Sequence, residues 1–143
     1  MKPKHIDMYM SIAHQAAKCS HAVRLKVGCI AVRDHQIISI GYNGTPQGWD
    51  NSCEVMMKDG ALLTRSEVIH AEANCIAKLC TSTISSEGAT IFVTHAPCLH
   101  CAKLIYGAGI KKVVYDQLYK SIDGLDFLNK VGIEVQKWKQ ELH

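Results

Sequence analysis

Two short motifs in this chain place zinc-binding side chains beside a carboxylate. The first is His70-Ala71-Glu72, and the second is Pro97-Cys98-Leu99-His100-Cys101. One imidazole and two thiols make three soft ligands, and a catalytic zinc keeps three protein ligands and leaves its fourth position to water. Zinc lowers the pKa of that water enough to supply hydroxide near neutral pH. We therefore predict a hydrolytic zinc site formed by His70, Cys98 and Cys101.

Glu72 has a different predicted role because it is not needed as a ligand. An offset of two residues is about 200° around a helix, so Glu72 and His70 cannot share one helix face. Both can reach inward, however, from the first turn. A carboxylate there can take a proton from the attacking water and pass protons to a ring nitrogen and a leaving amine. We predict that Glu72 is the catalytic acid and base.

Pro97 predicts the start of a helix, because a missing N–H costs nothing in a first turn. Cys98 and Cys101 would share that turn, where the helix dipole favours thiolates. Taken alone, the Cys-x-x-Cys pair also fits a redox pair or half of a structural zinc knuckle. The combination with His70 and Glu72 favours catalysis.

Length and composition limit the class of protein. The 143 residues are most simply one domain, 1–143, that is long enough to bury a core. A net charge of +3 without a basic patch makes polymeric nucleic acid an unlikely partner and suits a small anionic substrate. The start of the chain has no apolar signal region and no run reaches membrane-spanning length, so we expect a cytoplasmic protein without membrane contact.

Seven cysteines fit a reducing compartment. Cys29, Cys75 and Cys80 fall on apolar faces of predicted elements, where a thiol behaves as a small hydrophobic group. We expect these three side chains in the core.

Hydrophobic periodicity predicts alternating helices and strands. We expect an α/β fold, a three-layer α/β/α domain with a mixed five-stranded sheet, that begins with an antiparallel hairpin turning at Asp34-His35. The predicted helices cover residues 4–18, 71–79, 98–106 and 123–130, and the predicted strands cover 27–32, 36–42, 90–94, 112–115 and 133–136.

The long loop at 45–69 exceeds usual connection lengths and contains Gly48 and Gly60. We predict that its section 50–63 is partly helical. Its length indicates a functional role, either through direct contacts with a ligand or as a lid that makes none.

The glycine-rich segment Gly41-Tyr42-Asn43-Gly44-Thr45-Pro46-Gln47-Gly48, taken with the two zinc motifs, resembles the deoxycytidylate deaminases of the cytidine deaminase-like superfamily. The resemblance extends from the first helix to Tyr115. It implies a cytidine deaminase-like fold, hydrolysis of dCMP to dUMP and ammonia for thymidylate synthesis, and a homohexamer that dCTP activates and dTTP inhibits. The tRNA adenosine deaminases typically have a bulkier, more basic turn here.

Carried over by this resemblance, His70, Cys98 and Cys101 hold Zn²⁺ and Glu72 shuttles protons. Asn43 is expected to contact a sugar hydroxyl, although Asn beside glycines is also a common turn residue. Asn43, Gly44 and Gly48 are expected to bind the effector, with Mg²⁺ accompanying its triphosphate, and Ala71 to contact nucleotide. Asp116 follows a strand where such sheets bind ligands, and is either a pocket residue or a polar end of that strand.

Some relatives of this kind carry a second, structural zinc. Cys19 and Cys53 stand where two of its ligands are expected, but the region before His70 offers Val68 instead of another ligand, and the long loop holds no histidine. We do not expect a second zinc, and His95 or His100 are the remaining candidate ligands. The candidate partners for a substrate phosphate are Lys58, Arg65, Lys103 and Lys111.

Other activities remain open from the sequence. A related deaminase would act on dCTP, cytidine or an adenosine in tRNA, and the same zinc chemistry would serve each. A zinc-stabilised nucleotide-binding regulator without turnover is the non-enzymatic alternative. Glu72 argues against it, because a structural zinc has no use for an acid/base carboxylate.

Overall fold

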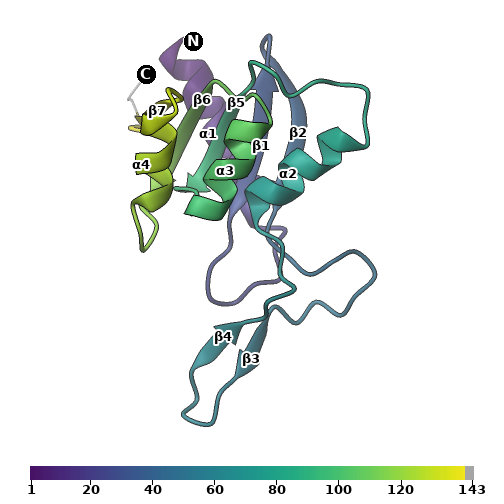
Figure 1. Ribbon diagram of the computed structural model, residues 1–143. Coiled ribbons are helices and arrows are strands. Elements are labelled where there is room, and N and C mark those ends of the chain that lie inside the picture. The colour runs from purple at the N-terminus through teal and green to yellow at the C-terminus, as the bar shows by residue number, and fades with distance from the viewer. Residues whose placement is uncertain (141–143) are drawn as a thin grey trace.

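The centre of the protein is a mixed five-stranded sheet, seen in a computed structural model that describes residues 1–140 (Figure 1). The strand order is β2-β1-β5-β6-β7. β1 pairs antiparallel with β2 and β5, whereas β6 pairs parallel with β5 and β7. The predicted mixed sheet is therefore confirmed. The strands are β1 (Gly28–Arg33), β2 (Gln36–Tyr42), β5 (Thr90–His95), β6 (Lys112–Gln117) and β7 (Glu134–Lys137).

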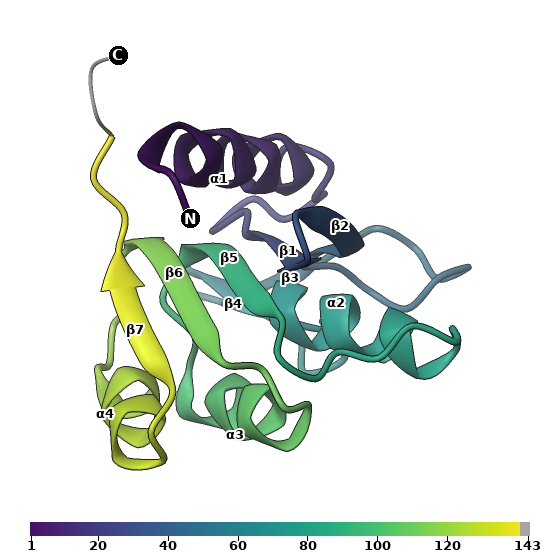
Figure 2. The same cartoon turned by 90° about the horizontal axis from the view of Figure 1, so that it is seen from above.

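Helices cover both faces of this sheet, as predicted (Figure 2). One face carries α1, and the other carries α2, α3 and α4. Each face is apolar because side chains alternate along the strands: Ile30 and Phe92 pack towards α1, while Ala31 and Val93 pack towards the other helices. The helices are α1 (Pro3–Ala17), α2 (Ala71–Cys80), α3 (Leu99–Gly107) and α4 (Asp123–Lys130), and the predicted bounds differ by at most one residue. No helix of the described residues is long and apolar enough to span a membrane.

The strand directions bring several loops to one edge of the sheet. Because β1 runs antiparallel to β5, the loop that enters β1 lies beside the loops that leave β5 and β6. The end of β2 reaches the same edge because β2 is antiparallel to β1. The hairpin between them turns at Asp34 and His35, whose φ angles of 51° and 61° suit the tight turn that was predicted.

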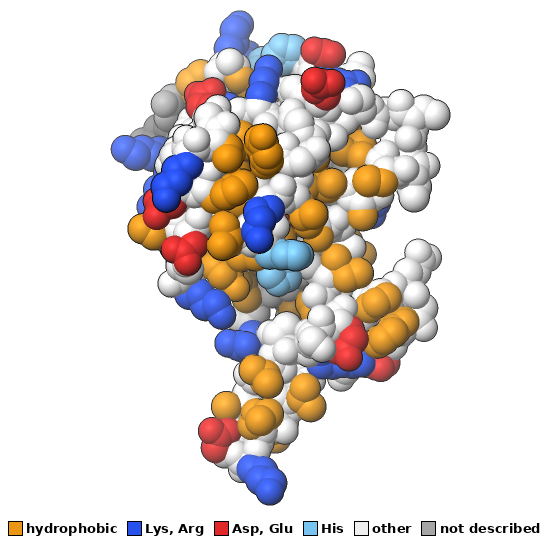
Figure 3. Space-filling model, in the orientation of Figure 1, with side chains coloured by type: hydrophobic (Ala, Val, Ile, Leu, Met, Phe, Trp, Pro, Cys, Tyr) orange, Lys and Arg blue, Asp and Glu red, His pale blue; other side chains and the backbone are white. Residues whose placement is uncertain are grey.

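The segment between β2 and α2 contains a hairpin, so the prediction of partial helix in 50–63 is wrong. β3 (Glu54–Met56) pairs antiparallel with β4 (Leu62–Thr64). Gly60, with φ of +84°, closes the turn by donating its N–H to Met57 O. Asp-Gly between apolar residues is a strong hairpin signal, and the helical interpretation overlooked it. The hairpin projects from the body as an arm that carries exposed apolar side chains (Figures 1 and 3).

One of the cysteine predictions also needs correction. Cys29 and Cys75 are fully buried, but Cys80 is exposed. Cys80 ends α2, where its thiol donates to Ile76 O at 3.6 Å on the outer side of the helix. The last turn of a surface helix presents one side to water, so apolar spacing alone misplaced this residue.

The first turn of α2 is fixed against β2 by close packing and hydrogen bonds. A Cβ on Gly41 would lie 2.5 Å from Ala71 O and 2.6 Å from Cys75 N, so only glycine allows this approach. Ser39 Oγ donates to Cys75 O at 2.7 Å, and Asn74 Nδ2 donates to Tyr42 O at 2.9 Å. These contacts set where the residues at the start of α2 point.

We expect Gly41→Ala to destabilise the protein, because the added methyl group meets the backbone of α2. Overpacking of this kind costs about 1–3 kcal/mol in the free energy of unfolding, which urea denaturation measures. Gly107→Ala is the matched control, because a Cβ there has nothing within 4 Å. Equal stabilities of the two variants would contradict this account of the β2–α2 contact.

Candidate metal centre and active-site cavity

The three predicted zinc ligands converge on one point. His70 Nδ1 lies 3.5 Å from Cys98 Sγ and 3.4 Å from Cys101 Sγ. A tetrahedral zinc with Zn–N and Zn–S bonds of about 2.0–2.1 and 2.3 Å separates its nitrogen and sulfur ligands by about 3.5 Å. All three ligand atoms lie within 4.8 Å of one another. The donor set and its spacing therefore fit a zinc ion.

These ligands occupy the starts of two helices. His70 is the N-cap of α2 and Cys98 is the N-cap of α3, where its Sγ accepts from Cys101 N at 3.5 Å. α3 therefore begins one residue later than predicted, and Pro97 precedes the cap instead of starting the first turn. Cys101 lies in the first turn as predicted, whereas Cys98 lies at the cap just before it.

Hydrogen bonds among the two thiols and the imidazole shift the pKa of each group. Hydrogen bonds with the Cys101 thiol and then His70 lower the pKa of Cys98 to about 3. The pKa of Cys101 is raised, first by its hydrogen bond to Cys98 and next by burial. The hydrogen bond to Cys98 also raises the pKa of His70. A metal ion at this point would replace the shared protons, because zinc needs both sulfurs as thiolates and the ring as neutral imidazole.

Glu72 is buried beside the trio but is not one of the grouped ligands. Its side chain is 4% exposed, and it belongs to the first turn of α2. Burial raises its pKa to about 7, because a charged carboxylate is disfavoured away from water. At neutral pH this group can both accept and donate a proton, as acid/base catalysis requires.

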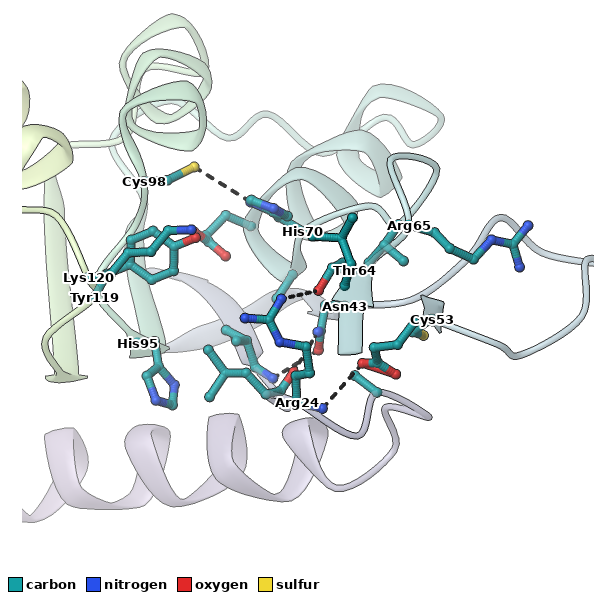
Figure 4. A pocket seen from close by; sticks show the side chains of 18 of the residues that line it. Arg24, Asn43, Cys53, Thr64, Arg65, His70, His95, Cys98, Tyr119 and Lys120 are labelled. Atoms are coloured by element: carbon teal, nitrogen blue, oxygen red, sulfur yellow. Dashed lines mark hydrogen bonds between the residues drawn. The ribbon is translucent and has the colours of Figure 1, made fainter. Parts of the chain in front are cut away.

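A cavity of about 730 Å³ opens in front of these residues (Figure 4). His70, Glu72 and Cys98 line it together with loop residues from the same edge of the sheet. Three cationic side chains also line it: Arg24, Arg65 and Lys120. The cavity thus joins a metal centre and a buried acid/base group to a positively charged region, which suits an anionic substrate.

Of the predicted nucleotide contacts, Asn43 and Ala71 line this cavity. The Asn43 side chain is already engaged, because Oδ1 accepts from Val27 N at 2.9 Å and Nδ2 donates to Leu25 O at 2.8 Å. Gly44 exchanges backbone hydrogen bonds with Ile69. Gly48 lies in an exposed loop with φ of +88° and is not part of the cavity wall.

Asp116 also lies outside the cavity wall. Its Oδ2 lies 2.8 Å from His14 Nε2, so it links β6 to α1. Its neighbour in space, His95, does line the cavity, and burial lowers the pKa of that imidazole. The prediction that Asp116 follows a strand is wrong, because β6 extends to Gln117, and the side chain serves the contact with α1.

Only one of the predicted phosphate partners reaches the cavity. Arg65 lines it, but its Nη1 donates to Asp50 Oδ1 at 2.9 Å and to Ser52 O at 2.8 Å, which holds the loop before the arm. Lys58, Lys103 and Lys111 are not among the residues of its wall. Arg24 and Lys120 also line the cavity but were not predicted from the sequence, since no motif marks these loop positions.

Candidate ligands for a second zinc do not form a three-ligand group among the described residues. Cys19 is exposed and Cys53 is buried, and neither joins a three-ligand group within residues 1–140. His100 is exposed on α3. We expect elemental analysis of the purified protein to give one zinc per chain, and two per chain would contradict this expectation.

The zinc-dependent nucleobase deaminases combine these features, since they use a His/Cys/Cys zinc site together with a glutamate that is not a ligand. The family model described as the cytidine and deoxycytidylate deaminase zinc-binding region matches residues 3–117. The chain belongs to this family and is a deaminase.

Three known proteins illustrate its relatives. The ComE operon protein 2 of Bacillus subtilis is 40% identical over 90% of this chain and 68% of its own length. The deoxycytidylate deaminase of Enterobacteria phage T4 is 33% identical, covering 88% of this chain and 86% of the phage protein. The dCMP deaminase of cyanophage S-TIM5, solved with dCMP and dUMP, superposes with a TM-score of 0.90 at 42% identity over 96% of this chain and 99% of that one.

Replacing Glu72 by Gln tests its separation from the metal ligands. We expect bound zinc to stay at the wild-type level, because Glu72 is not one of the three grouped ligands. Deaminase turnover should fall by roughly 10²–10⁴-fold through loss of the proton shuttle. Elemental analysis and ammonia release give the two readouts. Loss of zinc in Glu72→Gln would show that the carboxylate supports the metal site instead.

Proposed function

We propose that this enzyme hydrolyses dCMP to dUMP and ammonia. The observation that carries the proposal is the cavity, whose lining combines two of the zinc-ligand candidates, His70 and Cys98, and the carboxyl group of Glu72 with the cations Arg24 and Lys120. A pyrimidine at the metal and a phosphate at the cations would use both features. The similarity to a solved dCMP deaminase over nearly the whole chain supports the same substrate.

The reaction needs water activation and the relay of both protons of that water to the substrate. His70, Cys98 and Cys101 would hold the zinc ion, which when bound would supply a hydroxide nucleophile near neutral pH. Glu72 would take one proton from the attacking water and deliver it to N3 of cytosine. It would then take the second proton from the new hydroxyl group at C4 and deliver it to the 4-amino group, so that the C4–N bond breaks and ammonia leaves. Its raised pKa fits this use, because the carboxyl must take up and release a proton twice in each turnover.

Arg24 and Lys120 are the candidate phosphate partners. Both side chains are exposed at the cavity, and the Arg65 guanidinium is engaged by Asp50. A guanidinium offers several N–H donors to phosphate oxygens, whereas an ammonium acts as a point charge. A nucleoside would leave these cations unmatched, which is the physical basis for preferring the monophosphate.

We also propose the regulation and assembly that the family resemblance implies. A dCTP activator and a dTTP inhibitor, with Mg²⁺ on the triphosphate, would share a site at Asn43, Gly44 and Gly48 in a cytoplasmic homohexamer that supplies dUMP for thymidylate synthesis. The hydrogen bonds of Asn43 support the proposal that an effector bound there could change substrate binding. Its side chain holds the backbone of the loop that carries Arg24, so a ligand that moved Asn43 would also move a cation of the cavity.

Ammonia release from the zinc-loaded protein tests the substrate. We expect turnover of dCMP and a kcat/KM for deoxycytidine that is lower by at least about tenfold, because the phosphate partners are left unmatched. Equal use of deoxycytidine would contradict the proposal, and preferred use of dCTP would favour the triphosphate as substrate. Activity confined to an adenosine in tRNA would place the enzyme in another branch, and zinc binding without any turnover would favour the regulator.

The dCMP saturation curve tests regulation. We expect dCTP to lower the dCMP concentration that gives half-maximal rate and dTTP to raise it, because each effector shifts the population of the binding-competent state. Light scattering of the same samples measures assembly. Curves that neither nucleotide alters would contradict the proposed control.

A further inference from the structure

Arg24 lies in a loop that has no regular structure of its own. The loop joins α1 to β1, and side chains from elsewhere hold its backbone. At its β1 end, Asn43 bonds to Leu25 O and Val27 N. The rest of the loop needs another anchor to keep Arg24 at the cavity.

The base of the β3–β4 arm provides that anchor. Glu54 Oε1 and Oε2 each accept from Val23 N at 3.1 Å, and Oε2 also accepts from Arg24 N at 3.2 Å. Arg24 Nη1 donates to Thr64 Oγ1 at 3.3 Å (Figure 4). Glu54 and Thr64 face each other in the β3–β4 register. One cross-strand pair therefore holds both the backbone and the guanidinium of the same residue.

This arrangement orients the guanidinium as well as tethering it. A carboxylate that accepts two consecutive backbone N–H groups forms charge-assisted hydrogen bonds, which are stronger than neutral ones. A guanidinium is planar and has five N–H donors, so fixing one of them on Thr64 sets the plane of the others. The remaining donors stay available to the cavity that Arg24 lines.

We propose that the Glu54–Thr64 pair is a positioning device for Arg24, and that it thereby determines the preference of the enzyme for a nucleotide with a 5′-phosphate over the nucleoside. This inference rests on the proposed function for its substrate. It adds a role for the arm, because the two residues that bind Arg24 are the first residue of β3, Glu54, and the last residue of β4, Thr64.

The sign of the effect distinguishes positioning from simple electrostatics. Glu54 itself lines the cavity, and as a bare negative charge it would repel a phosphate. Removing that charge would then improve the use of dCMP. If Glu54 positions Arg24, removing the charge weakens the use of dCMP instead.

The test compares Glu54→Gln and Thr64→Val with the wild-type enzyme. We expect kcat/KM for dCMP to fall by roughly tenfold or more, because small displacements of a substrate-positioning group can cost up to about 100-fold. kcat at saturating dCMP and kcat/KM for deoxycytidine should both stay at wild-type values. Thr64→Ser keeps the hydroxyl and should restore the use of dCMP.

Asp59→Asn is the matched control. Asp59 Oδ1 also accepts a backbone N–H, from Ala61 at 2.9 Å, but at the tip of the arm and away from Arg24. This variant should keep the wild-type preference for dCMP. The double variant Arg24→Ala/Glu54→Gln should be no worse than Arg24→Ala alone, because Glu54 acts through Arg24.

A second readout does not depend on the substrate. Trypsin cleavage after Arg24 and Lys26, followed by mass spectrometry, should be faster in Glu54→Gln than in Asp59→Asn, because the loop loses its anchor. A wild-type enzyme that uses deoxycytidine as well as dCMP would refute the proposed function. Trypsin cleavage would still show whether Glu54 anchors the loop that carries Arg24. Unchanged or improved use of dCMP by Glu54→Gln in a dCMP-selective enzyme would overturn the inference, as would unchanged cleavage.

Discussion

The meeting of two helix starts is the constraint on which the rest of this structure depends. His70 caps α2 and Cys98 caps α3, so the zinc trio forms only if both helices begin at one point on the sheet. The packing beneath them serves that requirement. Gly41 lets α2 approach β2 closely, and α2 and α3 lie on the same face of the sheet.

Burial of Glu72 follows from the same arrangement. The first turn of α2 points inward, and the carboxyl group loses most of its contact with water. This costs stability, because a buried charge is unfavourable, but it gives the group a pKa near neutrality. The starts of α2 and α3 contribute no cation to the cavity. The loops around the cavity contribute Arg24 and Lys120, near the candidate zinc ligands and Glu72.

The parts that could be predicted from sequence are those fixed by local spacing. The spacing of the zinc-ligand candidates and the apolar pattern of residues 90–94 are local signals. The zinc trio and the sheet could therefore be predicted from the sequence. Arg24 and Lys120 were not, because they reach the cavity only through the order of the strands. The arm was mistaken for partial helix because strands of three residues are too short to show a period, although Asp59-Gly60 marked its turn.

A crystal structure of the zinc-loaded Glu72→Gln variant with dCMP would test the central claim most directly, because the variant should bind the substrate without consuming it. We expect the cytosine ring at the metal centre, with C4 facing the zinc, and the 5′-phosphate in contact with Arg24 and Lys120. A phosphate held elsewhere, or a base turned away from the zinc, would contradict the assignment of the cavity.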